Sequence, residues 1–270
     1  MADAAPAFTT IGEACRAVLL TAEPRAKLML ARSVARAWRQ GRLDHRFDAA
    51  MPDEPARPDT PELLPPNKMP KRGKGGSERA RIAMLHALAH IEFVAIDLAF
   101  DLIGRFGSEF PQEFVGDWLR VGADEAMHFA LLDRRLRQMD SHYGALPAHG
   151  GLWEAAQETA GDALARLAIV PMVLEARALD ITPETIKKFN DAGDFSSSRM
   201  LARIMTDEIR HVAFGTKWFN AATKRLGLSA PYHYQNLVNR HFRGVLKPPF
   251  NDSARDQAGL TRDYYIPLAY

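Results

Sequence analysis

The sequence predicts an all-α protein centred on a four-helix bundle. Three observations indicate this fold class: long segments with apolar residues at helical spacing, a single Pro-rich interruption, and two Asp-Glu-x-x-His motifs of the kind that helices present on one face. The 270 residues are 47% hydrophobic and 25% charged, which suffices for one sizeable core and an appended part.

Two helices are expected before the bundle, in an N-terminal extension that covers residues 1–45. Thr10 followed by Glu13 matches a capping box, and apolar residues at helical spacing follow it. Pro24 suits the first position of a second helix, which the Gln40-Gly41 pair would end.

Residues 46–76 are expected to form an extended connector, because repeated prolines from Pro52 to Pro70 break every helical register. A structureless segment of this length is unusual inside a compact domain, so it should wrap the surface or serve a function. Four basic residues near its end could contact the phosphates of a nucleic acid, although a solvated connector is the favoured interpretation. These residues are Lys68, Lys71, Arg72 and Lys74.

The bundle is assigned to residues 77–228. Its four helices are expected at about residues 77–103, 111–139, 152–179 and 197–226. A short helix opened by Thr182 and Pro183 is expected before the last of them. Residues 229–270 should add one helix, from about residue 231 to 246, and an apolar tail that packs back on the bundle.

Composition excludes several classes of protein. The longest apolar runs identified fall short of the roughly 20 residues that span a bilayer, so no membrane segment is expected. Residues 1–10 lack the pattern of a secretory signal, and Cys15 is the one cysteine, which excludes an intramolecular disulfide and a cysteine-based metal centre. A net charge of +2 is too small to indicate a nucleic-acid or membrane partner. We therefore expect a cytoplasmic protein.

Two Asp-Glu-x-x-His motifs are the main functional signal. They are Asp124-Glu125-Ala126-Met127-His128 and Asp207-Glu208-Ile209-Arg210-His211. Residues three apart on a helix lie on one face, so the Glu and His of each motif can bind the same metal ion. Four-helix bundles that hold two metal ions add one Glu from each of the other two helices, and the candidates here are Glu92 and Glu175.

The spacing of these residues strengthens the prediction. Glu92 precedes Glu125 by 33 residues, and Glu175 precedes Glu208 by 33 residues, so the whole set repeats with an offset of 83 residues (175 − 92 and 208 − 125). Two helical hairpins related by a pseudo-two-fold axis would supply one half-site each. Pro171, one turn before Glu175, is expected to kink its helix.

Electrostatics favours metal ions over a polar network of the protein alone. Four carboxylates in a bundle interior would each cost about several kcal/mol of desolvation and would repel one another. Two divalent cations balance these charges and leave two neutral imidazoles as further ligands. Carboxylate and imidazole ligands without thiolate suit iron or manganese better than a structural zinc ion. Asp124 and Asp207 would each accept a hydrogen bond from a ligand histidine and so fix its tautomer. Arg210 could orient one of these aspartates.

Each residue also has a simpler interpretation. The glutamates could be exposed salt-bridging residues, and the Glu-x-x-His pairs could lie on a solvated helix face. The apolar neighbours of Glu92 make that interpretation the weaker one. His86 and His90 lie off the face of Glu92, and we expect them to be buried, hydrogen-bonded histidines.

These motifs resemble the ferritin-like di-iron carboxylate superfamily, which includes bacterioferritin, rubrerythrin, the hydroxylase subunit of bacterial multicomponent monooxygenases and the small subunit of class I ribonucleotide reductase. The string HALAHIE, the connector ending in PELLPPNKMPKRGKGG and the paired motifs resemble, more narrowly, an uncharacterised bacterial ferritin-like family of unknown function that is distantly similar to the di-iron tRNA hydroxylases.

The resemblance implies two iron ions. Glu92, Glu125 and His128 would bind one, Glu175, Glu208 and His211 the other, and Glu125 and Glu208 would bridge them. The radical tyrosine of the ribonucleotide reductase subunit is replaced here by Leu132, which disfavours stable tyrosyl-radical chemistry. The long connector and the aromatic tail do not suit assembly into a storage cage.

The leading functional prediction is an oxidoreductase in which the two ions use O2 or peroxide to oxidise an unknown organic substrate, most simply by hydroxylation. Iron is preferred, with manganese or a mixed pair as alternatives, and the four ligand glutamates would belong to the catalytic centre. Two other functions stay open: detoxification of peroxide or ferroxidase activity, and a non-catalytic scaffold held together by metal. A tRNA partner is not favoured, and a homodimer is compatible with the sequence.

Overall fold

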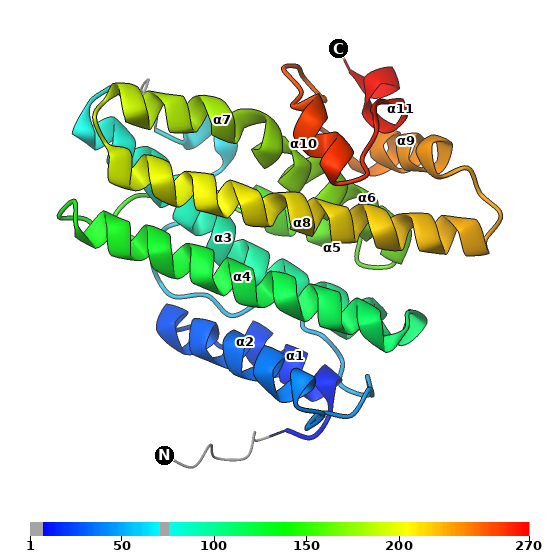
Figure 1. The fold of residues 1–270 in the computed structure, drawn as a ribbon. Helices are drawn as coiled ribbons and strands as arrows, with labels where there is room; N and C mark the ends of the chain where they lie inside the picture. Colours follow the sequence, from blue (N-terminus) through cyan, green and yellow to red (C-terminus); the bar gives the residue numbers. More distant parts are fainter. Residues whose placement is uncertain (1–7, 71–75, 270) are drawn as a thin grey trace. The chain divides into compact units, whose positions relative to one another are not determined.

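The computed structural model describes residues 8–70 and 76–269, and the regular secondary structure of this part is helical (Figure 1). Extended backbone pairs within these residues at three isolated bridges, Thr10–Asp44, Leu63–Ala148 and Leu246–Ala269. The all-α fold class is therefore confirmed. The described residues form two compact units, and each unit is described by itself.

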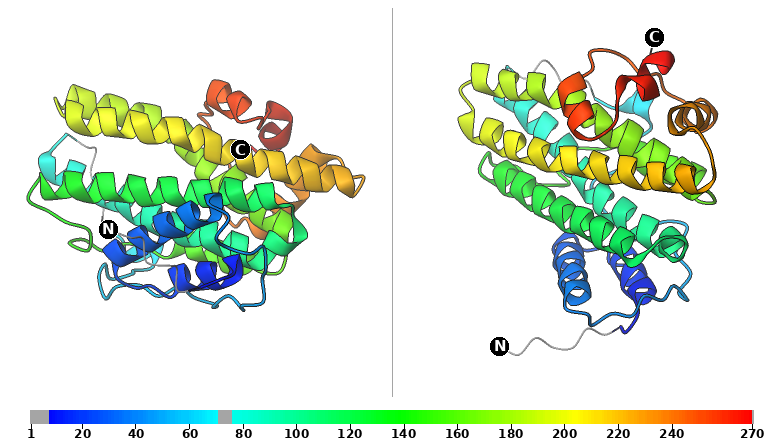
Figure 2. Two further views of the ribbon diagram at one scale, coloured as in Figure 1. Left: turned by 60° about the horizontal axis from the view of Figure 1, so that its bottom comes forward. Right: turned by 45° about the vertical axis from the view of Figure 1, so that its right-hand side comes forward.

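The first unit contains the described residues of Met1–Met69 and Leu85–Gly150. Its helices are α1 (Ile11–Leu19), α2 (Pro24–Arg39), the short η1 (Pro66–Lys68), most of α3 (Glu78–Phe106), η2 (Gly107–Glu109) and α4 (Gln112–Arg137). Helix α1 packs on α2, and α2 packs along α4 (Figure 2). The ligand candidates Glu92, Glu125 and His128 all belong to this unit.

The two N-terminal helices begin as their sequences predict. The Glu13 N–H donates to the Thr10 hydroxyl at 3.2 Å, and the Thr10 N–H donates to the Glu13 carboxylate at 3.1 Å, which completes the capping box. Pro24 occupies the first turn of α2, and the Glu23 carboxylate caps that helix. Gly41, with a φ of 65°, provides the left-handed residue after α2.

The connector lies against the helices of the first unit. The Arg105 guanidinium donates to the Pro52 carbonyl at 2.6 Å, and the Lys27 ammonium donates to the Ala56 carbonyl at 3.1 Å. A Cβ at Gly104 would lie 2.2 Å from the Met51 sulfur, so the absence of a side chain there lets the connector approach α3 closely. Of the four basic residues near the end of the connector, Lys68 is exposed. The other three, Lys71, Arg72 and Lys74, lie outside the described residues.

Among the described residues, helix α3 is the one helix that combines great length with a long apolar stretch. By length and composition, Glu78–Glu109 could cross a membrane, since one window of 18 residues has a mean hydropathy of 1.6. However, 67% of that window is buried inside the protein. A core helix passes the same test of length and composition, and the burial of α3 fits that interpretation.

The second unit contains the described residues of Pro70–Met84 and Gly151–Tyr270. Beside the first turns of α3, it contains α5 (Gly151–Glu158), α6 (Ala163–Ile169), η3 (Val170–Glu175), α7 (Ala176–Asp191), α8 (Phe195–Arg225), α9 (Ala230–His241), α10 (Asp252–Gln257), α11 (Arg262–Tyr265) and η4 (Ile266–Leu268). Helices α7 and α8 pack along each other as a hairpin (Figure 1).

Two sequence predictions for this unit are wrong in detail. Residues 152–179 do not form one helix, because the chain breaks between α5 and α6, where Asp162 caps α6 by accepting from the N–H groups of Leu164 and Ala165. Pro183 does not open a short helix, because α7 continues through it to Asp191. Proline is tolerated here at the cost of one backbone hydrogen bond.

The C-terminal tail packs on α7 and α8, as its apolar composition predicts. The Tyr264 hydroxyl donates to the Asn220 side chain at 2.5 Å. The buried Arg255 guanidinium forms an ion pair with Asp180 at 2.7 Å, and the Asn251 N–H donates to the same aspartate at 2.9 Å. One carboxylate of α7 therefore orders two points of the tail.

A buried ion pair joins α2 to α3 in the first unit. The Lys27 ammonium lies 2.5 Å from the Asp97 carboxylate, and both side chains are almost fully buried. Burial raises the pKa of Asp97 to about 7, although the nearby Lys27 charge opposes this rise. Burial likewise lowers the pKa of Lys27, again against the effect of its partner.

We expect Lys27→Met to lower the free energy of unfolding by about 3 kcal/mol, because Asp97 is left buried without its cation. The loss should be larger at about pH 8 than at about pH 6, since a raised pKa in the folded state costs stability as rising pH ionises the group. Urea unfolding at both pH values measures this. The double variant Lys27→Met/Asp97→Leu should recover most of the loss, and a double variant as unstable as the single one would contradict the prediction.

Candidate metal centre

Helices α3 and α4 bring the first set of ligand candidates together. Glu125 and His128 lie one turn apart on α4, and Glu92 faces them from α3. The helices approach closely because α4 has a glycine at the contact: a Cβ at Gly122 would lie 2.7 Å from the Phe100 ring. The close packing of α3 on α4 therefore sets the distance between Glu92 and the Glu125-x-x-His128 motif.

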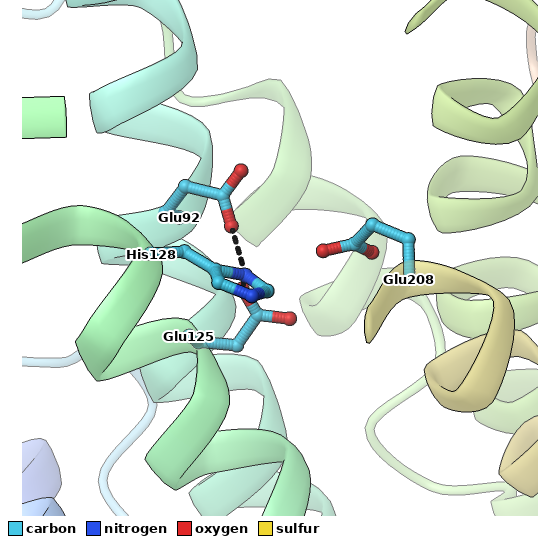
Figure 3. Close-up of side chains that lie close together, drawn as sticks. All are labelled: Glu92, Glu125, His128 and Glu208. Atoms are coloured by element: carbon cyan, nitrogen blue, oxygen red, sulfur yellow. Dashed lines mark hydrogen bonds and ion pairs between the residues drawn. The ribbon is translucent and has the colours of Figure 1, made fainter. Parts of the chain in front are cut away.

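Glu92, Glu125 and His128, here named the first triad, converge in the buried interior (Figure 3). The His128 Nδ1 atom lies 3.3 Å from a Glu92 oxygen and 3.4 Å from a Glu125 oxygen. Each residue offers one donor atom, and these atoms lie within 4.8 Å of one another. The exposed fractions are 6% for Glu92, 1% for Glu125 and 0% for His128, so bulk water does not solvate the charges.

The first triad is electrostatically strained without a cation. Burial raises the pKa of Glu92 well above its usual value near 4.5, and the neighbouring Glu125 charge raises it further. The hydrogen bond with His128 lowers it only in part. Two carboxylates that share a dry site cannot both ionise cheaply, and a bound cation would offset this cost.

Glu175, Glu208 and His211, here named the second triad, lie in the second unit. Glu175 ends η3, and Glu208 and His211 lie one turn apart on α8, with the His211 Nδ1 atom 3.6 Å from a Glu208 oxygen. Their donor atoms also lie within 4.8 Å of one another. Glu208 and His211 are buried, whereas Glu175 is half-buried.

A wide helical turn positions Glu175. Residues Val170–Glu175 form a π-helical turn between α6 and α7, and Pro171, which has no N–H to donate, lies in it. Gly215 on α8 makes room for this turn, because a Cβ there would lie 2.6 Å from the Pro171 ring. Where a kink was expected at Pro171, the structure has a widened turn that ends on the ligand candidate.

The residues predicted to lie behind the ligands are placed as follows. The Asp207 carboxylate accepts from the Arg210 guanidinium at 2.9 Å and from the Arg203 guanidinium at 3.2 Å. Asp124 is half-buried on α4, directly before Glu125. The effect of Asp124, Asp207 and Arg210 on the ligand histidines remains a prediction.

The donor set of each triad suits a hard or borderline metal ion. Two carboxylates and one imidazole provide a charge of −2, which matches one divalent cation, and buried helices fix all three groups. The Cys15 thiol belongs to neither triad; it is fully buried on α1, where burial and then the Asp101 charge raise its pKa. The structure thus contains buried Glu/His clusters that could bind metal ions.

His86 and His90 are buried structural histidines, as expected. The His86 Nε2 atom accepts the Gly144 N–H at 2.9 Å, and burial lowers the pKa of both imidazoles to about 4. The His90 Nδ1 atom lies 3.0 Å from the Tyr143 hydroxyl. Tyr143 was not identified from the sequence, because it comes from the loop after α4, where no periodic pattern marks it.

We expect the metal-free protein to lose stability relative to its Glu92→Gln variant as pH rises above about 4.5. A glutamate with a raised pKa in the folded state binds its proton more tightly folded than unfolded, so rising pH favours unfolding at about 1.4 kcal/mol per pKa unit. Urea unfolding in a chelator at several pH values measures the difference. Exposed Glu54 provides the control, Glu54→Gln. Equal pH slopes for wild type and Glu92→Gln would contradict the analysis of the first triad.

Comparison with known proteins identifies a family and one similar protein, and neither carries a described function. The chain is 42% identical over 213 residues to an uncharacterized protein of Haemophilus influenzae (strain ATCC 51907 / DSM 11121 / KW20 / Rd), a match that covers 77% of this chain and 74% of the relative. No solved structure matches the chain significantly. The model of one family, described as "Protein of unknown function (DUF455)", matches residues 20–266. The chain, with both of its triads inside the matched region, therefore belongs to this family.

Proposed function

We propose that the protein is a di-iron carboxylate oxidoreductase that uses O2 or peroxide to oxidise an organic substrate. The observation that supports this most is the first triad: two carboxylates and an imidazole, almost fully buried, with donor atoms within 4.8 Å of one another. Such a cluster is costly for a protein to maintain unless a cation neutralises it.

The residues of each triad would hold one ion. With the ion bound, the Nδ1 atom of His128 would be the imidazole donor, because this atom faces both carboxylates. Glu92 and Glu125 would both bind as carboxylates, since the charge of the cation offsets the burial and the Glu125 charge that raise the Glu92 pKa. His211 and Glu208 have the corresponding arrangement in the second unit, with Glu175 as the third ligand.

The pairing of the two ions in one centre is inferred from the sequence. The two triads repeat with one offset of 83 residues, and the resemblance to the ferritin-like di-iron proteins implies that the two half-sites work together. Iron is the proposed metal because the donors are carboxylates and imidazoles without thiolate. Manganese suits the same donors and is the alternative.

A bound pair of iron ions supplies redox equivalents and a Lewis acid for O2 or peroxide. The chain contributes buried carboxylates that would hold the ions and imidazoles positioned by helix packing, with bulk water excluded from the first triad. Glu92, Glu125, Glu175 and Glu208 are the proposed catalytic residues, and Asp124, Asp207 and Arg210 are the proposed positioning residues.

We expect the purified protein to bind about two iron ions per chain under anaerobic conditions, one for each triad. Glu125→Gln/His128→Ala should lose one ion and Glu208→Gln/His211→Ala the other, as measured by elemental analysis after gel filtration. The exposed glutamates Glu113 on α4 and Glu184 on α7 provide matched controls, Glu113→Gln and Glu184→Gln. A protein that binds no divalent metal, or variants that bind as much as the controls, would refute the metal centre.

We expect rapid mixing of the anaerobic iron-loaded protein with O2 to give a transient absorption change that either double ligand variant abolishes, because the proposed chemistry needs both ions. Oxygen uptake that is coupled to an added organic substrate supports the proposal. Peroxide or O2 consumption without such coupling would replace it with detoxification or ferroxidase activity. Tight iron binding that raises the melting temperature but gives no reaction would replace it with a structural role for the metal.

A further inference from the structure

The first unit contains an open pocket of about 690 Å3 that the proposed chemistry does not explain. It lies where the N-terminal turn of α2 and the connector meet the second half of α4 and the loop after it. All residues that line it belong to the first unit. Its volume is in the range of pockets that bind small organic ligands, which is about 300–1,000 Å3.

The floor of the pocket is aromatic and held in place. The rings of Phe129 and Tyr143 meet edge to face, with centroids 4.9 Å apart and an interplanar angle of 87°. The Tyr143 hydroxyl is 3.0 Å from the His90 Nδ1 atom, which fixes the ring from behind. Leu28 adds aliphatic surface to the wall. A planar or apolar ligand body would therefore find preformed contacts.

The charges around the pocket are unequal in a way that favours an anion. Three arginines and two acidic residues line it, but both carboxylates are engaged by the protein: Glu23 accepts the N–H groups of Arg25 and Ala26 at the start of α2. Asp133 accepts the Tyr143 N–H at 3.0 Å and the Arg137 guanidinium at 2.9 Å.

Two guanidinium groups are left for a ligand. Those of Arg25 and Arg134 have no hydrogen-bond or ion-pair partner among residues 8–70 and 76–269. Both side chains are exposed, so they are hydrated rather than buried in the protein. Guanidinium groups bind phosphate and carboxylate through paired hydrogen bonds, and they lose less hydration than an ammonium group does when they bind.

We propose that this pocket binds a small organic anion, with a planar apolar body on Phe129 and Tyr143 and a phosphate or carboxylate group at Arg25 and Arg134. The site does not depend on metal. It adjoins the first triad through aromatic packing: Phe129 directly follows His128, and the Phe93 ring, directly after Glu92, lies 5.3 Å from the Phe129 ring. If the proposed oxidation holds, such an anion is the class of substrate that we infer for it.

The test is calorimetric titration of the metal-free protein with phenyl phosphate, benzoate, phenol and inorganic phosphate. We expect phenyl phosphate or benzoate to bind at least about tenfold more tightly than phenol or inorganic phosphate, because only these probes combine a ring with a charge. The preferred probe of the two identifies the anionic group. Because no metal is present, this result stands or fails separately from the metal centre.

Matched variants decide whether the pocket is the site. Arg25→Gln/Arg134→Gln should weaken binding of the preferred probe at least about tenfold and leave the melting temperature unchanged, since both residues are exposed and their guanidinium groups have no partner among the described residues. Arg32→Gln/Arg120→Gln removes the same charge from exposed positions of α2 and α4 outside the pocket, and it should change the affinity less than about twofold.

Three outcomes would overturn the inference. These are no binding of either charged ring, equal losses in the two double variants, and inorganic phosphate binding as tightly as phenyl phosphate. The second outcome would mean that net charge alone attracts the probes. The third would mean that the aromatic floor contributes nothing. A Tyr143→Ala variant tests the floor independently, and an unchanged affinity for the preferred probe would likewise count against the site.

Discussion

The first unit depends most on one constraint, the desolvation free energy of two neighbouring buried carboxylates. Glu92 and Glu125 are both more than nine-tenths buried, and desolvation costs several kcal/mol for each ion, so the pair needs either a shared proton or a cation. The raised pKa of Glu92 is the first of these solutions. The convergence of His128 on the same point provides a neutral donor that favours the second. The glycine at position 122 lets α3 and α4 pack closely, and α3 is largely buried along its length.

The second unit also brings two carboxylates and an imidazole together, but its local structure differs from that of the first unit. Its Glu-x-x-His pair lies on a regular helix, but the third carboxylate comes from the end of a widened turn and remains half-buried. A partly solvated carboxylate is easier to move than a buried one, because water compensates for the contacts that it gives up. The two triads are therefore alike in composition and differ in the burial of one carboxylate. In the proposed function, the half-buried Glu175 is the ligand that can most easily change its mode of binding.

The features that depend only on residues close together in the sequence were predicted correctly. The capping box of α1, Pro24 at the start of α2 and the three-residue spacing of each Glu-x-x-His pair follow from helix geometry alone, and the structure contains them. The break between α5 and α6 was not predicted although a local signal marks it, namely Gly161 followed by Asp162 as the N-cap of α6. The passage of α7 through Pro183 was not predicted because proline ordinarily begins or ends a helix. The pocket could not be predicted either. It joins α2, the connector, α4 and a loop, which lie more than a hundred residues apart at the extremes and share no periodic pattern.

The widened turn that ends at Glu175 also sets how α6 is rotated about its axis relative to α7. A π-helical turn accommodates one residue more than an α-helical turn over the same path, so the helix before it is rotated by about 100° relative to an uninterrupted α-helix. With this rotation, the buried Arg166 guanidinium on α6 donates hydrogen bonds to the Ala156 carbonyl and to the Thr159 hydroxyl. We expect deletion of a single residue between Val170 and Leu174 to change this rotation and to turn Arg166 away from those acceptors. An insertion or deletion in this short segment therefore affects residues beyond it, whereas a substitution acts locally, and of the six ligand candidates Glu175 is the one that lies within it.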